Sequence, residues 1–225
     1  DPIRLIIKDE PHTEAKIREG RFRLIHIFSL EDQVIDRLLF LPWIRSEILK
    51  PMDVTSKAGW APIPAGYQRL AREFPEDTSL AVDKSLWDWT MPEWVIKAYV
   101  EIKMEQCVNP TDLYHYLVWR RLAYVLGPQA RFRMSDGQEL NQMFWGVMKS
   151  GSLLTLSMNG MAQMLQHQLA CHRAGLNPGP IWTMGDDTLT NMRLTDAQVA
   201  DYWAALATTG CIVKKIERSR EFAGF

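Results

Sequence analysis

The most informative segment of the chain is IWTMGDDTLTN, residues 181–191. Its first four residues, 181–184, and its last four, 188–191, form two short runs that flank Gly185-Asp186-Asp187. Two strand-like runs joined by a glycine and acidic residues are typical of a β-hairpin. The segment therefore predicts a hairpin with the Asp186 and Asp187 carboxylates at its tip. An ordinary solvated turn is the alternative interpretation of the same residues.

A further carboxylate, Asp83, directly follows the apolar run 80–82. If the strands 80–82 and 181–184 are neighbours, Asp83 and Asp186 lie close together. Like charges at such a separation are costly unless a divalent cation neutralises them. Carboxylates without nearby histidine or cysteine ligands prefer Mg²⁺ or Mn²⁺. The pattern predicts a site for a pair of such ions, an arrangement that suits in-line phosphoryl transfer.

The remaining chain alternates between helical and strand-like patterns, which indicates an α+β fold with a small antiparallel sheet. We expect the helices to pack on one face of this sheet and the remaining elements to form a helix-rich subdomain. The expected helices cover residues 30–50 with a break or kink at Pro42, 65–73, 92–107, 111–127, 152–174 and 195–208. The expected further strands are a hairpin of residues 131–134 and 138–140, then 211–213 and 221–225.

The composition is that of a globular protein. The chain has 225 residues, of which 47% are hydrophobic and 24% charged, and this excludes a disordered, collagen-like or coiled-coil chain. No apolar run reaches the roughly 20 residues that a bilayer span needs, so we expect no membrane span. The net charge of -1 means that any nucleic-acid site must depend on local clusters of basic residues. Because the chain begins at Asp1, we expect it to be part of a longer protein.

Six short motifs follow one another along the chain. They are Lys8-Asp9-Glu10-Pro11 with Arg21 and Arg23-Leu24-Ile25; VDKSLWDW, with Asp83 and Asp88; SGSLLTLSMN, residues 150–159; MGDD, residues 184–187; Lys214-Lys215; and EFAGF, residues 221–225. The series resembles motifs F, A, B, C, D and E of viral RNA-dependent RNA polymerases, in the order of that family. In detail it is most similar to the sobemovirus and luteovirus-type polymerases of plus-strand RNA viruses. The family's thumb and N-terminal fingertip segment have no counterpart here.

The resemblance implies roles for the acidic and polar residues. Asp83 and Asp186 would hold the metal ions, with a less direct part for Asp187. Asp88 and Asn159 would hydrogen-bond the ribose 2'-hydroxyl of the incoming nucleotide and so distinguish ribose from deoxyribose.

The resemblance also implies roles for the residues around the third motif. Ser150 and Gly151 would form a flexible loop that approaches template and nucleotide closely, and Thr155 would support Asp88 and Asn159. Ordinary polarity on a helix surface is the alternative interpretation of Thr155 and Asn159.

The basic residues fit the binding of a triphosphate. The resemblance places Arg23, with Lys8 behind it, over the phosphates, and Arg21 competes with Arg23 for this role. A plain solvated surface is the alternative, because acidic residues alternate with these cations. Lys214 or Lys215 would donate a proton to the departing pyrophosphate, and the spacing does not distinguish between them. We interpret all five histidines as structural.

The resemblance further implies the palm and part of the fingers of a right-hand polymerase, with the thumb absent. Its divisions would be a fingers portion, 1–78, with the basic nucleotide-binding segment; palm, 79–96, with the first catalytic aspartate; a fingers insertion, 97–145; and palm, 146–225. The predicted activity is RNA-directed RNA synthesis by a nucleotidyltransferase. The alternatives are a reverse transcriptase and a non-catalytic palm-type scaffold that binds RNA.

The expected partners are RNA template and product, ribonucleoside triphosphates and other viral replication proteins. We expect the chain to work in the cytoplasm of the infected host cell, in replication complexes that reach membranes through those other proteins.

Overall fold

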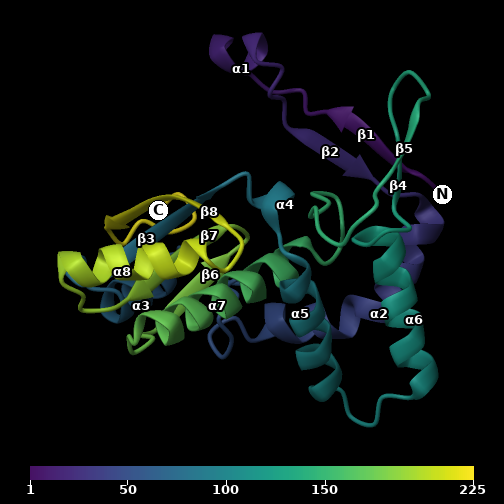
Figure 1. Ribbon diagram of the computed structural model, residues 1–225. Coiled ribbons are helices and arrows are strands. Elements are labelled where there is room, and N and C mark those ends of the chain that lie inside the picture. The colour runs from purple at the N-terminus through teal and green to yellow at the C-terminus, as the bar shows by residue number, and fades with distance from the viewer. The chain divides into compact units, whose positions relative to one another are not determined.

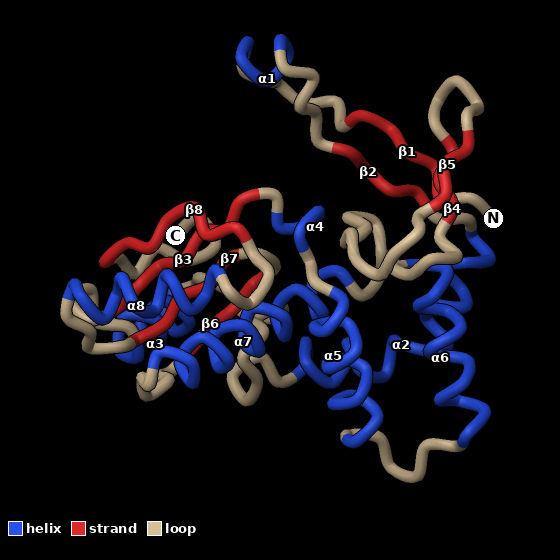
Figure 2. Tube along the Cα trace, viewed as in Figure 1, coloured by secondary structure: helices blue, strands red, loops and turns tan.

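The computed structural model describes all residues, 1–225, and confirms an α+β chain with eight helices (Figures 1 and 2). It divides into two compact units. The first unit comprises Asp1–Leu41 and Val108–Thr155, and the second comprises Pro42–Cys107 and Leu156–Phe225. Each unit contains a four-stranded sheet. None of the helices combines the length and the apolar character that a bilayer span requires.

The first unit contains the sheet β2-β1-β4-β5. Strand β1 pairs antiparallel with β2 and parallel with β4, so that it joins two hairpins into one sheet. Helix α1 lies at the tip of the β1–β2 hairpin (Figure 1). The elements are β1 (Ile3–Ile7), α1 (Glu14–Arg18), β2 (Leu24–Ile27), the first part of α2 (Leu30–Leu49), α6 (Asp112–Val125), β4 (Arg131–Arg133) and β5 (Glu139–Asn141).

Two strands of this first sheet were not expected. The β1 sequence IRLII and the β2 sequence LIHI are nearly continuous apolar runs without a clear alternation of polar residues. Such runs carry little periodic signal, and the β4 partner of β1 lies more than a hundred residues away in the sequence. The first sheet was therefore not predicted, and the small antiparallel sheet of the prediction corresponds to the sheet of the second unit.

The second unit contains the sheet β6-β7-β3-β8, in which all neighbouring strands are antiparallel. The strands are β3 (Ser79–Ser85), β6 (Ile181–Met184), β7 (Asp187–Asn191) and β8 (Ile212–Arg218). The predicted GDD hairpin is confirmed as β6–β7. The helices are the rest of α2, with α3 (Pro64–Glu73), α4 (Trp87–Thr90), α5 (Glu93–Glu105), α7 (Thr155–Ala174) and α8 (Asp196–Ala207).

Helices cover both faces of this second sheet, so the prediction of helices on one face is wrong. Successive β6 side chains point to opposite faces. Trp182 packs with Phe74 of α3 and Phe222 of the C-terminal segment in one aromatic core. On the other face, Thr183 lies against Gly160 of α7. Helix α8 is on this second side, where Tyr202 hydrogen-bonds His167 of α7 at 2.9 Å.

Most predicted helices are confirmed, whereas the break considered at Pro42 and the strand expected at 221–225 are not found. Helix α2 continues through Pro42, because the buried Phe40 and Trp43 side chains on either side of the proline stabilise it against the lost hydrogen bond. The segment 221–225 forms a turn instead of a strand. Its backbone closes on itself through a pair of hydrogen bonds between Phe222 and Phe225, and Phe222 is buried in the aromatic core.

Candidate active site

Three carboxylates come together at one end of the second sheet. Strand β3 pairs with β7 so that Val82 faces Thr188, which places Asp83 and Asp187 next along their strands at the same end. In the β6–β7 hairpin, Met184 faces Asp187, and Gly185 has a φ of +63° that suits glycine in a tight turn. The neighbour of β3 is β7 and not the strand 181–184, so the expected strand pairing is corrected while the carboxylates still converge.

The electrostatics of Asp187 reflect this convergence. Partial burial raises the pKa of the Asp187 carboxyl, and the negative charges of Asp186, Asp83 and Glu221 raise this pKa further. Glu221 comes from the C-terminal turn, and the sequence reasoning gave it no role in the site. Carboxylates from three separate segments of the chain therefore lie close enough to Asp187 to raise its pKa.

A lysine from the neighbouring strand contacts this group. The Nζ atom of Lys214 lies 2.5 Å from Oδ2 of Asp83, and both side chains are about half exposed. A register shift between β3 and β8 next to Asp83 brings Lys214 to this position. The hydrogen bond to Asp83 raises the pKa of Lys214. Lys215 is the cross-strand partner of Asp83 in the register, but its ammonium group pairs with Glu217, so Lys214 is the lysine that contacts Asp83.

The donor chemistry of this group fits a hard divalent cation, but a complete metal cage is not formed. No three histidine, cysteine, aspartate or glutamate side chains are placed so that one ion could be held by all of them. Asp83 carries an ion pair with Lys214. Carboxylate oxygens are the ligands that Mg²⁺ and Mn²⁺ prefer. The predicted ions therefore remain a proposal, in which a cation competes with Lys214 for Asp83.

The two residues predicted to read the ribose lie on different helices of the second unit. Asp88 is in the first turn of α4, directly after Leu86 and Trp87, and Leu86 has a left-handed φ of 52°. Asn159 is on α7 and only 4% exposed, and its Oδ1 atom has no hydrogen-bond partner. A buried acceptor without a partner costs about 1–3 kcal/mol, which a hydroxyl donor from a ligand would offset.

The predicted Ser150-Gly151 loop belongs to the first unit, where it lies against β2. The backbone N–H of Ser150 donates to Nδ1 of His26 at 3.3 Å, and the Ser150 hydroxyl donates to the carbonyl of Leu24 at 3.0 Å. Thr155 closes the loop, because its hydroxyl donates to the carbonyl of Lys149 at 2.8 Å. The hydrogen bonds of Thr155 therefore stabilise the loop, whereas the resemblance assigns this side chain to the support of Asp88 and Asn159.

Two of the three predicted triphosphate ligands lie side by side. The backbone N–H of Lys8 donates to the carbonyl of Arg23 at 2.8 Å across the β1–β2 hairpin. Both side chains contact Glu10, with Lys8 at 2.7 Å and Arg23 at 3.5 Å. The hydrogen bond from Lys8 lowers the pKa of Glu10. Arg21 lies further along towards the tip of the hairpin and pairs with Glu19. The geometry favours Lys8 and Arg23 as the pair.

Lys149, the residue before the loop, is buried without a carboxylate partner. It is 0% exposed, and its Nζ atom donates to the carbonyl of Val147 at 2.8 Å and to Oε1 of Gln142 at 2.5 Å. The ring centroid of Phe132 lies 5.1 Å from the same atom. Burial lowers the pKa of Lys149 to about 7 from its ordinary value of 10.5.

This lysine predicts a specific pH dependence of stability. Because its pKa is lower in the folded state, the unfolded chain binds more protons between pH 7 and pH 10.5, and the stability of the first unit increases with pH in this window. Lys149→Met is expected to reduce that slope by up to about 1.4 kcal/mol per pH unit. Urea denaturation of both proteins at several pH values between 7 and 9 measures the difference. Equal slopes would show that Lys149 stays charged when folded.

A family model described as "Viral RNA-dependent RNA polymerase" matches residues 3–137, which is more than half of the chain. The chain belongs to the viral RNA-dependent RNA polymerases. The match includes Asp83, Asp88 and the basic β1–β2 hairpin, while the GDD hairpin lies beyond it. The assignment of this polymerase chain to its family therefore does not depend on the GDD tripeptide.

Similar proteins include the replicase polyproteins of several viruses. Over 196 residues, the polymerase chain is 33% identical to replicase polyprotein P2AB of Cocksfoot mottle virus, covering 84% of this chain and 20% of the relative. It is 32% identical to replicase polyprotein P2AB of Southern bean mosaic virus, covering 84% of this chain and 19% of that protein. Protein P1-P2 of Turnip yellows virus is also 32% identical, over 84% of this chain and 19% of the relative.

These matches confirm the predicted similarity to sobemovirus and luteovirus-type polymerases. The chain spans about a fifth of the length of the curated relatives it matches.

Proposed function

We propose that this chain is the catalytic part of an RNA-directed RNA polymerase that joins ribonucleotides on an RNA template during viral genome replication. The observation that carries the proposal is the convergence of Asp83, Asp186 and Asp187 at one end of the second sheet. Clustered carboxylates destabilise a fold unless cations compensate them, so a scaffold without catalytic activity has no use for them. Membership of the polymerase family supports the same activity.

The proposed cofactor is a pair of Mg²⁺ or Mn²⁺ ions held by Asp83 and Asp186, with assistance from Asp187. When bound, such ions supply activation of the hydroxyl nucleophile and stabilisation of the charge on the leaving pyrophosphate. Lys214 is the better candidate for the general acid, because its Nζ atom lies next to Asp83 whereas that of Lys215 pairs with Glu217.

The proposed nucleotide ligands are basic residues for the triphosphate and polar residues for the ribose. Lys8 and Arg23 bind triphosphate oxygens, for which an arginine fork and an ammonium group are suited. Arg21 remains the alternative to Arg23. Asp88 and Asn159 hydrogen-bond the ribose 2'-hydroxyl, and the Asn159 Oδ1 atom, which has no partner, supplies an acceptor for it. The Ser150-Gly151 loop lets template and nucleotide approach the backbone.

The fold that accompanies this proposal is the palm of a right-hand polymerase with part of the fingers. The proposed divisions of this fold are a fingers portion, 1–78, palm, 79–96, a fingers insertion, 97–145, and palm, 146–225. They differ from the two compact units, whose boundaries follow residues 41, 107 and 155. The partners are RNA template and product, ribonucleoside triphosphates and other viral replication proteins. Work in cytoplasmic, membrane-associated complexes of the host cell belongs to the same proposal.

The test is primer extension on an RNA template by the parent polymerase, with ribonucleotides and deoxynucleotides supplied in parallel. We expect extension with ribonucleotides in the presence of Mg²⁺ and none after chelation. Preferential use of deoxynucleotides would identify a reverse transcriptase instead. Binding of RNA without any extension would support the non-catalytic scaffold.

Asn159→Ala is expected to reduce the preference for ribonucleotides over deoxynucleotides by about tenfold or more, because one hydrogen bond to the 2'-hydroxyl is lost. The measurement is the ratio of kcat/KM for a matched ribonucleotide and deoxynucleotide. Gln168→Ala, at an exposed position of the same helix, is the control and should leave the ratio unchanged. An unaltered ratio in Asn159→Ala would exclude Asn159 from ribose recognition.

A further inference from the structure

The Ser150-Gly151 loop is attached to strand β2 through one histidine. The N–H of Ser150 donates to Nδ1 of His26, and the Ser150 hydroxyl lies 3.3 Å from the same nitrogen. That hydroxyl also donates to the carbonyl of Leu24, two residues earlier on β2. Since Nδ1 of His26 accepts the backbone N–H, the proton of the neutral ring is on Nε2. The loop is therefore bound to β2 by both backbone and side-chain hydrogen bonds.

Gly151 extends this contact. A Cβ atom at position 151 would lie only 1.8 Å from the carbonyl oxygen of His26. A separation this short is impossible for any residue with a side chain unless the backbone moves. The loop thus approaches β2 as closely as glycine allows, and the atom it approaches belongs to His26.

The His26 side chain is itself held in place. It is 6% exposed, and its ring lies 6.0 Å from that of Phe132 on β4. Leu5 of β1 is its cross-strand partner. Burial, with a contribution from the charge of Lys149, lowers the pKa of His26 to about 4 from 6.5, so the ring is neutral near pH 7. A neutral, buried ring keeps Nδ1 available as an acceptor.

The same strand leads directly to the proposed triphosphate ligands. Strand β2 begins at Leu24, immediately after Arg23, and the carbonyl of Arg23 accepts the backbone N–H of Lys8. A displacement of the loop relative to β2 is therefore also a displacement relative to these two cations. Strand β2 therefore connects the loop, through hydrogen bonds, with the segment that carries Arg23 and pairs with Lys8.

We propose that His26 is a positioning residue of the polymerase, which holds the Ser150-Gly151 loop in register with Arg23 and Lys8 and so pre-forms the nucleotide site. This inference rests on the proposed function, and it revises the sequence-based interpretation of all five histidines as structural. When the loop is already ordered, nucleotide binding does not have to supply the free energy of ordering it. A change at His26 should therefore alter the affinity for the nucleotide and not the rate of the chemical step.

The kinetic test compares His26→Leu and His26→Asn in the parent polymerase. Leucine fills a similar volume without an acceptor, whereas the asparagine Oδ1 atom takes the approximate place of Nδ1. We expect His26→Leu to raise the KM for ribonucleotides about tenfold with kcat changed less than about twofold, the equivalent of one or two lost hydrogen bonds. His26→Asn should restore the KM to within about threefold of wild type. His172→Leu, at an exposed position, is the control.

A second readout does not depend on polymerase activity. Hydrogen exchange of the Ser150 amide, measured on the same proteins, should be about tenfold faster in His26→Leu and close to wild type in His26→Asn. Equal KM values in His26→Leu and wild type, an asparagine variant as defective as the leucine variant, or unchanged exchange would each overturn the proposal. Absence of RNA synthesis by both wild type and His172→Leu would reject the proposed function, while the exchange result still decides the role of His26.

Discussion

Asp186→Asn in the parent polymerase is expected to lower the rate of RNA synthesis by about three orders of magnitude or more, because the substitution removes a carboxylate ligand of the proposed ions, which stabilise the negative charge that develops on the leaving pyrophosphate. Asparagine has nearly the shape of aspartate, so the hairpin should keep its structure. Its turn depends on Gly185, whose φ of +63° is unaffected by the change. The measurement is the single-turnover rate of primer extension at saturating Mg²⁺.

The matched control for this prediction is Asp201→Asn. Asp201 is an exposed aspartate on α8 and is not among the residues proposed for the site. It should extend primers at the wild-type rate, and the thermal unfolding midpoints of both variants should stay close to that of wild type. Full activity in Asp186→Asn would remove the GDD hairpin from the catalytic site.

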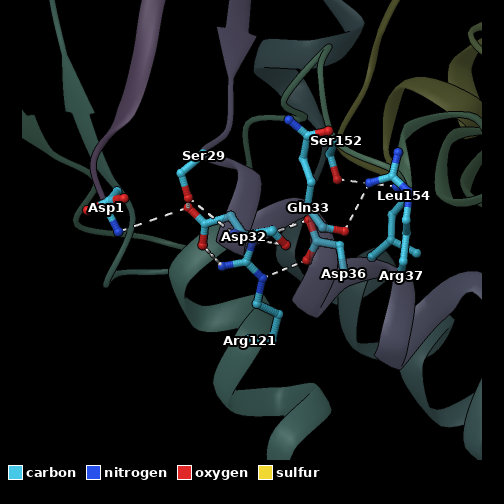
Figure 3. A network of polar contacts seen from close by, with 9 residues as sticks. All are labelled: Asp1, Ser29, Asp32, Gln33, Asp36, Arg37, Arg121, Ser152 and Leu154. Carbon is cyan, nitrogen blue, oxygen red and sulfur yellow. Dashed lines mark hydrogen bonds and ion pairs between the residues drawn. The ribbon is translucent and has the colours of Figure 1, made fainter.

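Arg121→Met is expected to destabilise the first unit by about 3 kcal/mol, the largest stability effect that we predict. Figure 3 shows Arg121 of α6 between two aspartates of α2. Its guanidinium donates to Asp36 at 2.6 Å and 3.1 Å, and to Asp32 at 2.6 Å. Asp36 is 3% exposed. Without the arginine, two nearby carboxylates would remain with little solvent to stabilise their charge.

The neighbouring arginine supplies the control. Arg120 is exposed and contacts the hydroxyl of Tyr116 at 2.9 Å, so Arg120→Met should cost less than about 1 kcal/mol. Hydrogen exchange of the α6 amides as a function of urea concentration reports the free energy of unfolding of this unit. Equal losses in the two variants would show that the Asp32–Arg121–Asp36 network contributes no more than a surface contact.

The parts of the fold that could be predicted from sequence are those with local signals. The hairpin of residues 181–191 has its strands and its turn within eleven residues, and helix α6 begins at Thr111, whose hydroxyl accepts from the N–H of Tyr114. Such features depend on neighbours in the chain. The carboxylate cluster was predictable because Asp83 follows an apolar run, although β3 continues to Ser85, and because Asp186 and Asp187 follow the strand β6.

The parts that could not be predicted depend on distant contacts. The parallel pairing of β1 with β4 and the bond between His26 and Ser150, 124 positions apart, leave no periodic trace in either segment. The ion pair between Lys214 and Asp83 required the β3–β8 register shift, which nothing in the local sequence specifies. The covering of the second sheet on both faces was missed because the contact of Phe74, at the end of α3, with Trp182 joins segments that are far apart in the sequence.

The central claim is that Asp83, Asp186 and Asp187 bind divalent cations at one end of the second sheet. A titration of the parent polymerase with Mn²⁺, followed by electron paramagnetic resonance of the free ion, tests it without reference to activity. We predict a pair of bound ions in wild type and in Asp201→Asn, and a loss of at least one of them in Asp186→Asn. The same number of ions bound with the same affinity in all three proteins would contradict the claim.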